Sequence, residues 1–87
     1  MRALRRGRPH AADVQQLMQV IFVPCSELMD NDVVLGVRRD GRYAAWQSPL
    51  RVRNIRGVRR WCDEQNRDQG AVMCSAYFGC EMKVIRK

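Results

Sequence analysis

Hydrophobic and polar residues alternate with two different periods along this chain of 87 residues. Between Ala11 and Val23 the apolar positions recur every three to four residues. They are Val14, Leu17, Met18, Ile21 and Phe22. This spacing predicts an amphipathic helix that Pro24 ends. Its apolar stripe would face the core of the domain or, in a homodimer, a second copy of the chain.

The next segment, Val33 to Gln47, is typical of a β-hairpin around the turn Asp40-Gly41. The pairs expected across it are Arg39 with Arg42, Arg38 with Tyr43, Val37 with Ala44 and Leu35 with Trp46. The predicted core face consists of Val33, Leu35, Val37, Ala44 and Trp46. The predicted outer face consists of Val34, Gly36, Arg38, Tyr43, Ala45 and Gln47. We expect Ser48-Pro49 to end the hairpin.

The stretch from Leu50 to Arg60 has five arginines and changes period within itself. Its first residues alternate as in a strand, and from Asn54 onward the apolar residues Ile55 and Val58 have helical spacing. Asn54 would be the N-cap, and the helix would run to about Arg67. Arginines at the start of a helix oppose its dipole. They indicate either an anionic partner or an ordinary solvated face.

The rest of the chain predicts strands. Ala71 to Phe78 alternates and is apolar on both faces, as in a central strand, and Met82, Val84 and Ile85 suggest a last short one. We therefore expect an α+β fold: an N-terminal helix and an Arg-rich helix packed on a three- to four-stranded antiparallel sheet. Residues 1–10 would be a flexible basic arm, and residues 11–87 a single small domain.

Charge narrows the choice of partner. The formal net charge is +7, and of the sixteen basic residues only Lys83 and Lys87 are lysines. Arginine suits bidentate contact with phosphate or carboxylate, although base composition of the genome could give the same bias. A positive field favours nucleic acid, an anionic surface or an acidic protein. No apolar run is long enough to cross a membrane and no signal peptide is evident, so we expect a cytoplasmic protein with free thiols.

The candidate contacts gather in the predicted hairpin and the Arg-rich stretch. Those expected to bind a nucleic acid or another partner are Arg38, Arg39, Arg42, Tyr43, Arg51, Arg53, Arg56, Arg59 and Arg60. On the predicted hairpin Arg38 and Tyr43 would form an exposed platform for a phosphate or an unstacked base. The alternative is a cation–π pair that only decorates the sheet.

The arm carries a short motif. Arg5-Arg6-Gly7-Arg8-Pro9 resembles an AT-hook, whose extended Arg-Gly-Arg-Pro segment lies in the minor groove of A·T-rich DNA. The resemblance covers these residues only. It would place Arg6 and Arg8 in the groove, with Arg5 beside them. The alternative is a basic arm without a specific site.

A second resemblance concerns the hairpin. Gly36-Val37-Arg38-Arg39 and Tyr43-Ala44-Ala45-Trp46 are similar to the opening strands of sheet-reading DNA-binding domains of the plant AP2 and integrase arm-binding types. The chain departs from that pattern after Trp46, where Pro49 interrupts and the aromatic-glycine third strand is missing.

Catalytic chemistry is sparse. His10 is the only histidine, no serine or cysteine has an evident base partner, and no glycine-rich phosphate loop is present. Cys74 and Cys80 lack the spacing of a zinc site, and buried thiols are the simpler interpretation of the four cysteines. We expect no enzyme, no metal and no cofactor.

Two functions remain. The first is a small nucleic-acid-binding protein that holds the phosphate backbone through the Arg-rich segment and the hairpin tip, with DNA expected rather than RNA. The alternative is a small inhibitor or adaptor, of the kind that phages and other mobile elements encode. It would dock its basic face on an acidic surface of a partner, including a nucleoprotein complex.

Overall fold

Between residues 18 and 87, the part that this computed structural model describes, the regular structure is antiparallel β-strand with two short 3-10 turns. The strands are β1 (Gln19–Pro24), β2 (Val33–Arg39), β3 (Arg42–Ile55), β4 (Val58–Cys62), β5 (Asp68–Ala71) and β6 (Cys80–Arg86). The turns are η1 (Cys25–Glu27) and η2 (Cys74–Tyr77). These residues contain no α-helix, so the expectation of an α+β fold is wrong.

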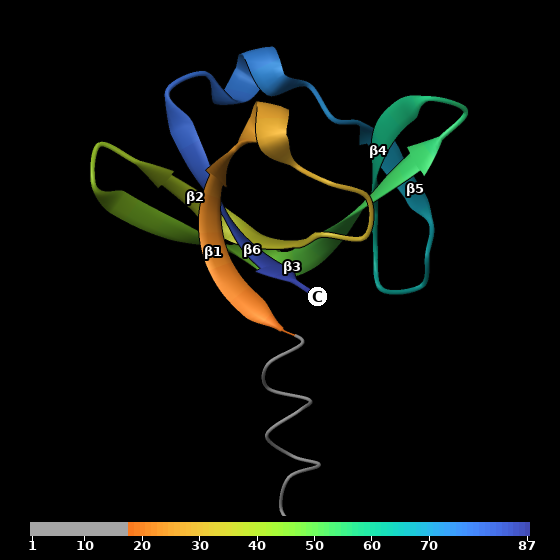
Figure 1. Cartoon of the computed structure of the whole chain (residues 1–87), viewed down its shortest axis with the longest axis horizontal. Helices are drawn as coiled ribbons and strands as arrows, with labels where there is room; N and C mark the ends of the chain where they lie inside the picture. Colours follow the sequence, from red (N-terminus) through yellow and green to blue (C-terminus); the bar gives the residue numbers. More distant parts are fainter. Residues whose placement is uncertain (1–17) are drawn as a thin grey trace, which may run out of the picture.

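The six strands form one sheet in the order β1-β6-β2-β3-β4-β5. Figure 1 shows that this sheet is strongly bent and that η1 and η2 lie next to each other over one of its open sides. The β2–β3 turn and the β3–β4 turn lie at opposite sides of the molecule (Figure 1). The strand β6 lies inside the sheet, second from the β1 edge, and pairs with β1 on one side and with β2 on the other.

The predicted hairpin around Asp40-Gly41 is confirmed near its turn. Arg39 pairs with Arg42, Arg38 with Tyr43 and Val37 with Ala44, as expected. The expected pair of Leu35 with Trp46 does not form, because the register shifts between Val34, opposite Leu50, and Gly36, opposite Ala45. Ser48-Pro49 does not end the hairpin: β3 absorbs the extra residues as an irregularity and continues to Ile55.

The shift changes which side chains of β2 face the core. Val34 and Val37 lie opposite Val84 and Met82 of β6, and with a residue inserted between them both point inward. Val34 is fully buried and Val37 packs against the core. Val33 and Leu35 are only half-buried, so the predicted core face is wrong on this side of the irregularity.

The prediction of a helix from Ala11 to Val23 is also wrong for the part of it that the structure describes. Residues 19–23 belong to β1, and residues 11–17 lie outside the described part of the chain. Ile21 points to the core and Phe22 to the outer face, as neighbours on a strand must. A run of β-branched and aromatic residues, Val20 to Val23, favours a strand in this position.

The Arg-rich helix is replaced by a second hairpin. Ile55 pairs directly with Val58 across a two-residue turn formed by Arg56 and Gly57. Both turn residues have positive φ, 54° and 80°, which matches the twist of paired strands. Asn54 is not a helix cap: its backbone N–H donates to Asp30 Oδ1 at 2.6 Å.

The predicted strand from Ala71 to Phe78 is wrong over most of its length, because β5 ends at Ala71 and η2 follows. The core lies between the bent sheet and the two 3-10 turns. Its buried side chains are Val23, Cys25, Leu28, Val34, Val52, Trp61, Met82 and Val84. Trp46 meets Trp61 edge to face with ring centroids 5.3 Å apart, which joins the two halves of the bent sheet.

Candidate functional site

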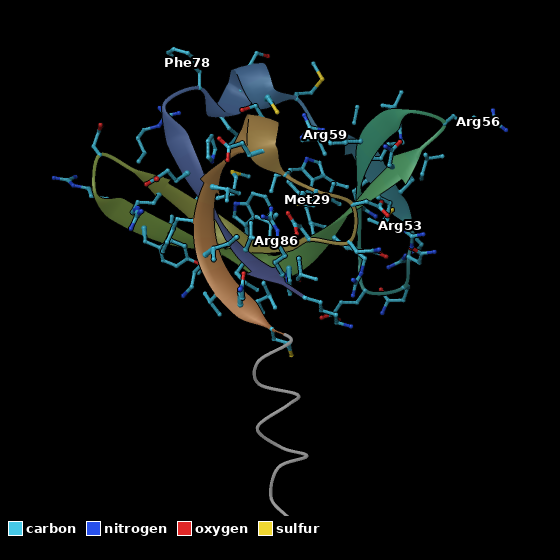
Figure 2. All side chains as sticks on the ribbon, viewed as in Figure 1. Met29, Arg53, Arg56, Arg59, Phe78 and Arg86 are labelled. Atoms are coloured by element: carbon cyan, nitrogen blue, oxygen red, sulfur yellow. The ribbon has the colours of Figure 1, made fainter. Side chains whose placement is uncertain are left out.

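The predicted binding residues do not form one surface. Arg39 and Arg42 flank the β2–β3 turn, and Arg56 lies at the β3–β4 turn, where Figure 2 shows it pointing away from the molecule. The 14 residues of β3 join the two turns. At about 3.3 Å per residue this strand is on the order of 40 Å long, so the two turns cannot contact the same phosphate.

Most of the Arg-rich stretch does share one face, the outer face of the β3–β4 hairpin. Arg51 and Arg53 are two residues apart on β3, so their side chains lie on the same face. Arg60 of β4 is the direct cross-strand partner of Arg53. Like charges placed directly opposite each other destabilise a sheet unless an anion compensates them. We call Arg51, Arg53, Arg56 and Arg60 the arginine ribbon.

The arginines of this face differ in how many hydrogen bonds and ion pairs they make within the protein. Arg60 Nε donates to Asp68 Oδ2 at 2.6 Å. Within residues 18–87, Arg53 makes one side-chain hydrogen bond, in which a terminal nitrogen donates to the amide oxygen of Asn66 at 3.3 Å. Its Nε also lies 4.0 Å from a carboxylate oxygen of Asp30, at the limit of an ion pair. That Nε is buried and has no hydrogen-bond partner among the described residues. In the same part of the chain Arg51 donates only to a backbone oxygen, that of Asn31, at 3.3 Å. Arg51 and the terminal nitrogens of Arg53 therefore retain hydrogen-bonding capacity for an external acceptor, whereas the buried Nε of Arg53 is closed to solvent.

A hollow of about 430 Å³ lies beside this face. Its lining residues are Val33, Pro49, Arg51, Arg53, Cys62, Asp63, Glu64 and Asn66. Asp63 is held ionised: the backbone N–H of Arg67, and then its guanidinium, keep the pKa of Asp63 below the usual value. The hollow thus presents both signs of charge. A partner that enters it must approach from the arginine side or carry a donor for the carboxylates.

The tip of the arginine ribbon differs from the rest. Arg56 adopts the left-handed conformation, which favours Gly, Asn and Asp, and it makes no hydrogen bond or ion pair within residues 18–87. Ile55 and Val58 beside it are 41% and 46% exposed. Strained backbone is typical of functional turns. The tip therefore offers a free guanidinium between two apolar side chains.

Arg59 makes several internal contacts, and its predicted binding role stays a prediction. Its position on β4 turns it to the inner face, between the two 3-10 turns. One terminal nitrogen donates to the backbone oxygens of Cys25, Ser26 and Leu28 at 3.0 to 3.3 Å. Figure 2 shows Arg59 pointing toward η1. The guanidinium thus supplies a donor to the carbonyls of Ser26 and Leu28, while the Cys25 carbonyl also accepts the backbone N–H of Leu28 at 3.1 Å.

Arg38 and Tyr43 form a packed cluster on the outer face of the other half of the sheet. The Arg38 guanidinium lies 3.7 Å from the centre of the Phe22 ring and bonds to Glu81 Oε1 at 2.6 Å. Phe22 meets Tyr43 edge to face at 6.1 Å, and Lys83 Nζ lies 5.1 Å from the Tyr43 ring centre. The expected platform of Arg38 and Tyr43 thus has a third member, the aromatic Phe22 of β1, and its arginine is already paired with the carboxylate of Glu81.

At the β2–β3 turn, Arg39 Nε donates to Cys80 Sγ at 3.1 Å, while Arg42 makes no hydrogen bond or ion pair within the described residues. Arg42 is thus the free guanidinium of this turn. The arm residues Arg5, Arg6 and Arg8 lie outside the part of the chain that the structure describes.

Sequence reasoning missed Ile55 and Val58 as surface residues of the candidate site. Their separation by three positions fits one face of a helix and equally fits a pair across a two-residue turn. The signal that distinguishes the two is Gly57, because glycine in the second turn position of a hairpin is common and in the first turn of a helix is unfavourable.

In residues 18–87 no group of three or more potential metal ligands is placed to hold an ion, and no helix is long and apolar enough to cross a membrane. Comparison of the chain with protein-family models, with curated proteins and with solved structures finds no match. The case for a function therefore rests on the site itself.

Proposed function

We propose that this protein binds nucleic acid and that the arginine ribbon is its contact surface. The observation that carries the proposal is the direct pairing of Arg53 with Arg60 on one outer face, with Arg51 on the same face and Arg56 at the tip. Phosphate oxygens would supply the anion that this arrangement needs, and guanidinium groups bind them through two parallel hydrogen bonds.

Duplex DNA is the form of nucleic acid that fits the ribbon best. Within residues 18–87 the end of the β3–β4 hairpin, Ile55 to Val58, is two-stranded, because β5 pairs only from Arg60 onward and β2 only up to Arg51. A two-stranded β-ribbon has the width of the B-form major groove, so this end could enter it. The major groove of A-form RNA is too deep and narrow for side chains to read. Single strands are held mainly by stacking on aromatic rings, and the paired segment from Arg51 to Cys62 carries no aromatic residue on the face of the arginine ribbon. The arm residues Arg6 and Arg8 would add a minor-groove contact.

Arg42 gives a second, separate phosphate contact in this proposal, because it lies at the far end of β3. The two turns would then touch separate parts of the backbone, since they lie at opposite sides of the molecule (Figure 1). We further propose a cytoplasmic location and a binding role without catalysis, in keeping with the sequence.

Fluorescence anisotropy with labelled 20-bp duplex DNA, single-stranded DNA and duplex RNA tests the proposal at about 50 and 200 mM salt. We expect the DNA duplex to bind tightest. The variant Arg51→Gln/Arg56→Gln should lower affinity and reduce the slope of log K against log salt by about 1 for each phosphate that the variant no longer binds. Lys87→Gln removes a charge at the exposed C-terminus and is the control for net charge.

Equal affinity of the double variant and the wild type, or binding only at low salt without preference among the three ligands, would show that the ribbon is not a site. A second candidate would then stand: docking on an acidic protein surface. The exposed Ile55 and Val58 favour it, since apolar side chains around an arginine are typical of protein hot spots.

A further inference from the structure

Two cysteines far apart in the sequence meet where the 3-10 turns touch. Cys25 lies in η1 and Cys74 in η2, 49 residues later, and their Sγ atoms are 2.7 Å apart. A disulfide bond is about 2.05 Å long, so the two sulfurs need to approach by only about 0.7 Å. Each thiol lies in a short 3-10 turn and not in a strand of the sheet.

The two thiols have different surroundings. Cys25 is 3% exposed, and burial, together with the nearby Cys74 sulfur, raises its pKa to about 12. Cys74 is half-buried, and a terminal nitrogen of Arg59 lies 3.6 Å from its sulfur. Because Cys74 is the more exposed of the two, it is the thiol that a reagent in solution reaches and that attacks first.

Access to the pair is through a hollow of about 400 Å³. Both sulfur-bearing residues line it, together with Ser26, Ser75, Tyr77 and Gly79 among others. A hollow of this size admits a small organic disulfide. Cys80 also lines it, but its sulfur accepts a hydrogen bond from Arg39 at 3.1 Å. Cys62 is buried and lies on another face of the molecule, opposite Arg51.

We propose that Cys25 and Cys74 are a redox modification site, which forms a reversible disulfide by exchange with a small disulfide of the glutathione class. The Cys74 thiolate attacks one sulfur of the reagent, its S–S bond breaks, and one small thiolate leaves and takes up a proton. Cys25 then loses its proton to solvent and attacks Cys74 Sγ, which releases the second small thiol. The protein is oxidised by two electrons and one small disulfide is reduced to two thiols.

The bridge would tie η1 to η2, which Arg59 already links through hydrogen bonds. It closes a long loop that contains β2 to β5, so it restricts the unfolded chain strongly. In a reducing cytosol the thiols would remain free and the bridge would form under oxidative conditions. This proposal is independent of the proposed nucleic-acid binding, because neither cysteine belongs to the arginine ribbon.

The test uses the full chain, reduced, desalted and then incubated with oxidised glutathione. Peptide mapping by mass spectrometry should find a Cys25–Cys74 bridge, with the loss of two hydrogens and no retained glutathione. The oxidised protein should melt roughly 10 °C or more above the reduced one, and dithiothreitol should reverse the shift. A persistent mixed disulfide, a bridge to Cys80, or no reaction in the wild type would overturn the proposal.

Variants identify the order of attack. Cys25→Ser should stop at a mixed disulfide on Cys74, whereas Cys74→Ser should not react at Cys25. Cys62→Ser and Cys80→Ser are the matched controls and should still form the bridge. If the wild type forms the bridge but Cys74→Ser reacts readily at Cys25, the proposed role of Cys74 as the attacking thiol is wrong.

Discussion

Arg86, at the end of β6, forms a two-pronged ion pair with Asp32, just before β2. Nε lies 2.9 Å from Oδ1 and a terminal nitrogen lies 2.7 Å from Oδ2. Asp32 is 1% exposed, and its Oδ2 also accepts the backbone N–H of Met29 at 2.8 Å. The hydrogen bond to Asp32 raises the pKa of Arg86. The ion pair joins β6 to the loop between η1 and β2.

Removal of one member of this pair should be costly. In Arg86→Gln the Asp32 carboxylate stays buried without its counter-ion, and we expect the free energy of unfolding to fall by about 3 kcal/mol in urea titrations. Lys87→Gln, the exposed neighbour, should change it by less than about 0.5 kcal/mol. The double variant Asp32→Asn/Arg86→Gln should lose less than the sum of the single variants, and simple additivity would show that the two residues do not interact.

Gly36 has no room for a side chain. A Cβ there would lie 2.4 Å from the Ala44 backbone oxygen, 2.5 Å from the Tyr43 hydroxyl and 2.8 Å from Ala45 Cα. We expect Gly36→Ala to lower the free energy of unfolding by about 2–3 kcal/mol, because the β2–β3 pairing must open. Measured in a Tyr43→Phe background, most of the loss should remain, since two of the three close atoms are backbone. Full recovery there would mean that the hydroxyl alone causes the clash.

The same substitution should destabilise the protein at Arg59 and leave its stability unchanged at Arg56. Arg59→Gln leaves the carbonyls of Ser26 and Leu28 without the guanidinium donor, and we expect a loss of about 2–3 kcal/mol in thermal or urea unfolding. Arg56→Gln should leave stability within about 0.5 kcal/mol of the wild type, because Arg56 makes no internal hydrogen bond or ion pair in the described residues. Equal stability of the two variants would contradict this assignment of roles.

Acid should weaken the end of the sheet that holds β4 and β5. The backbone N–H groups of Arg67 and Gly70, followed by arginine side chains, hold the pKa values of Asp63 and Asp68 below their usual 3.8. A carboxyl whose pKa is depressed on folding stabilises the protein above its unfolded pKa, and this contribution is lost as the pH falls through the folded value.

The urea concentration at the unfolding midpoint should therefore decrease as the pH is lowered below about 4. In Asp63→Asn or Asp68→Asn this decrease should be smaller. Asp40→Asn is the control, since the Asp40 side chain makes no hydrogen bond within residues 18–87. If the urea midpoint falls as steeply with decreasing pH in Asp63→Asn and Asp68→Asn as in the wild type, these carboxyls are not the cause of the acid sensitivity.

The parts of the fold that could be predicted are those decided by neighbours in the sequence. Asp40-Gly41 adopts positive φ at both positions, 52° and 77°, so it dictates a two-residue turn and the pairing of Arg39 with Arg42. A last strand around Met82, Val84 and Ile85 also follows from the sequence, and β6 confirms it. Beyond the turn the prediction fails at Leu35, because the irregularity is imposed by β6 and β3 together.

The predicted helices are wrong because short apolar spacings are ambiguous. A separation of three positions between Ile55 and Val58 satisfies a helix. The strand is decided by the pairing of β4 with β3 along its length and, from Arg60 onward, with β5. Local propensity is weak compared with the hydrogen bonds that an open strand edge gains from a neighbour. The same holds for Val20 to Val23, which pairs with residues that follow about 60 positions later.

The candidate site was predicted as a set of arginines with Tyr43, and this set stays a prediction. Charge along the chain does not reveal which arginines have internal partners: Glu81 for Arg38, Asp68 for Arg60 and the η1 segment for Arg59. Among the predicted arginines of residues 18–87, Arg42 and Arg56 make no internal hydrogen bond or ion pair, and Arg39, Arg51 and Arg53 use only some of their donors internally. These five have donors free for a partner.

The sequence by itself determined the positive charge of this protein, its preference for arginine over lysine and the turn at Asp40-Gly41, because these depend on composition or on adjacent residues. Tertiary structure decided the all-β fold, the division of the arginines into free and internally bound, and the meeting of Cys25 with Cys74. The physical reason is common to all three. Sheet pairing, ion pairs and thiol contacts join residues tens of positions apart, and their free energy exists only when the chain has closed those distances.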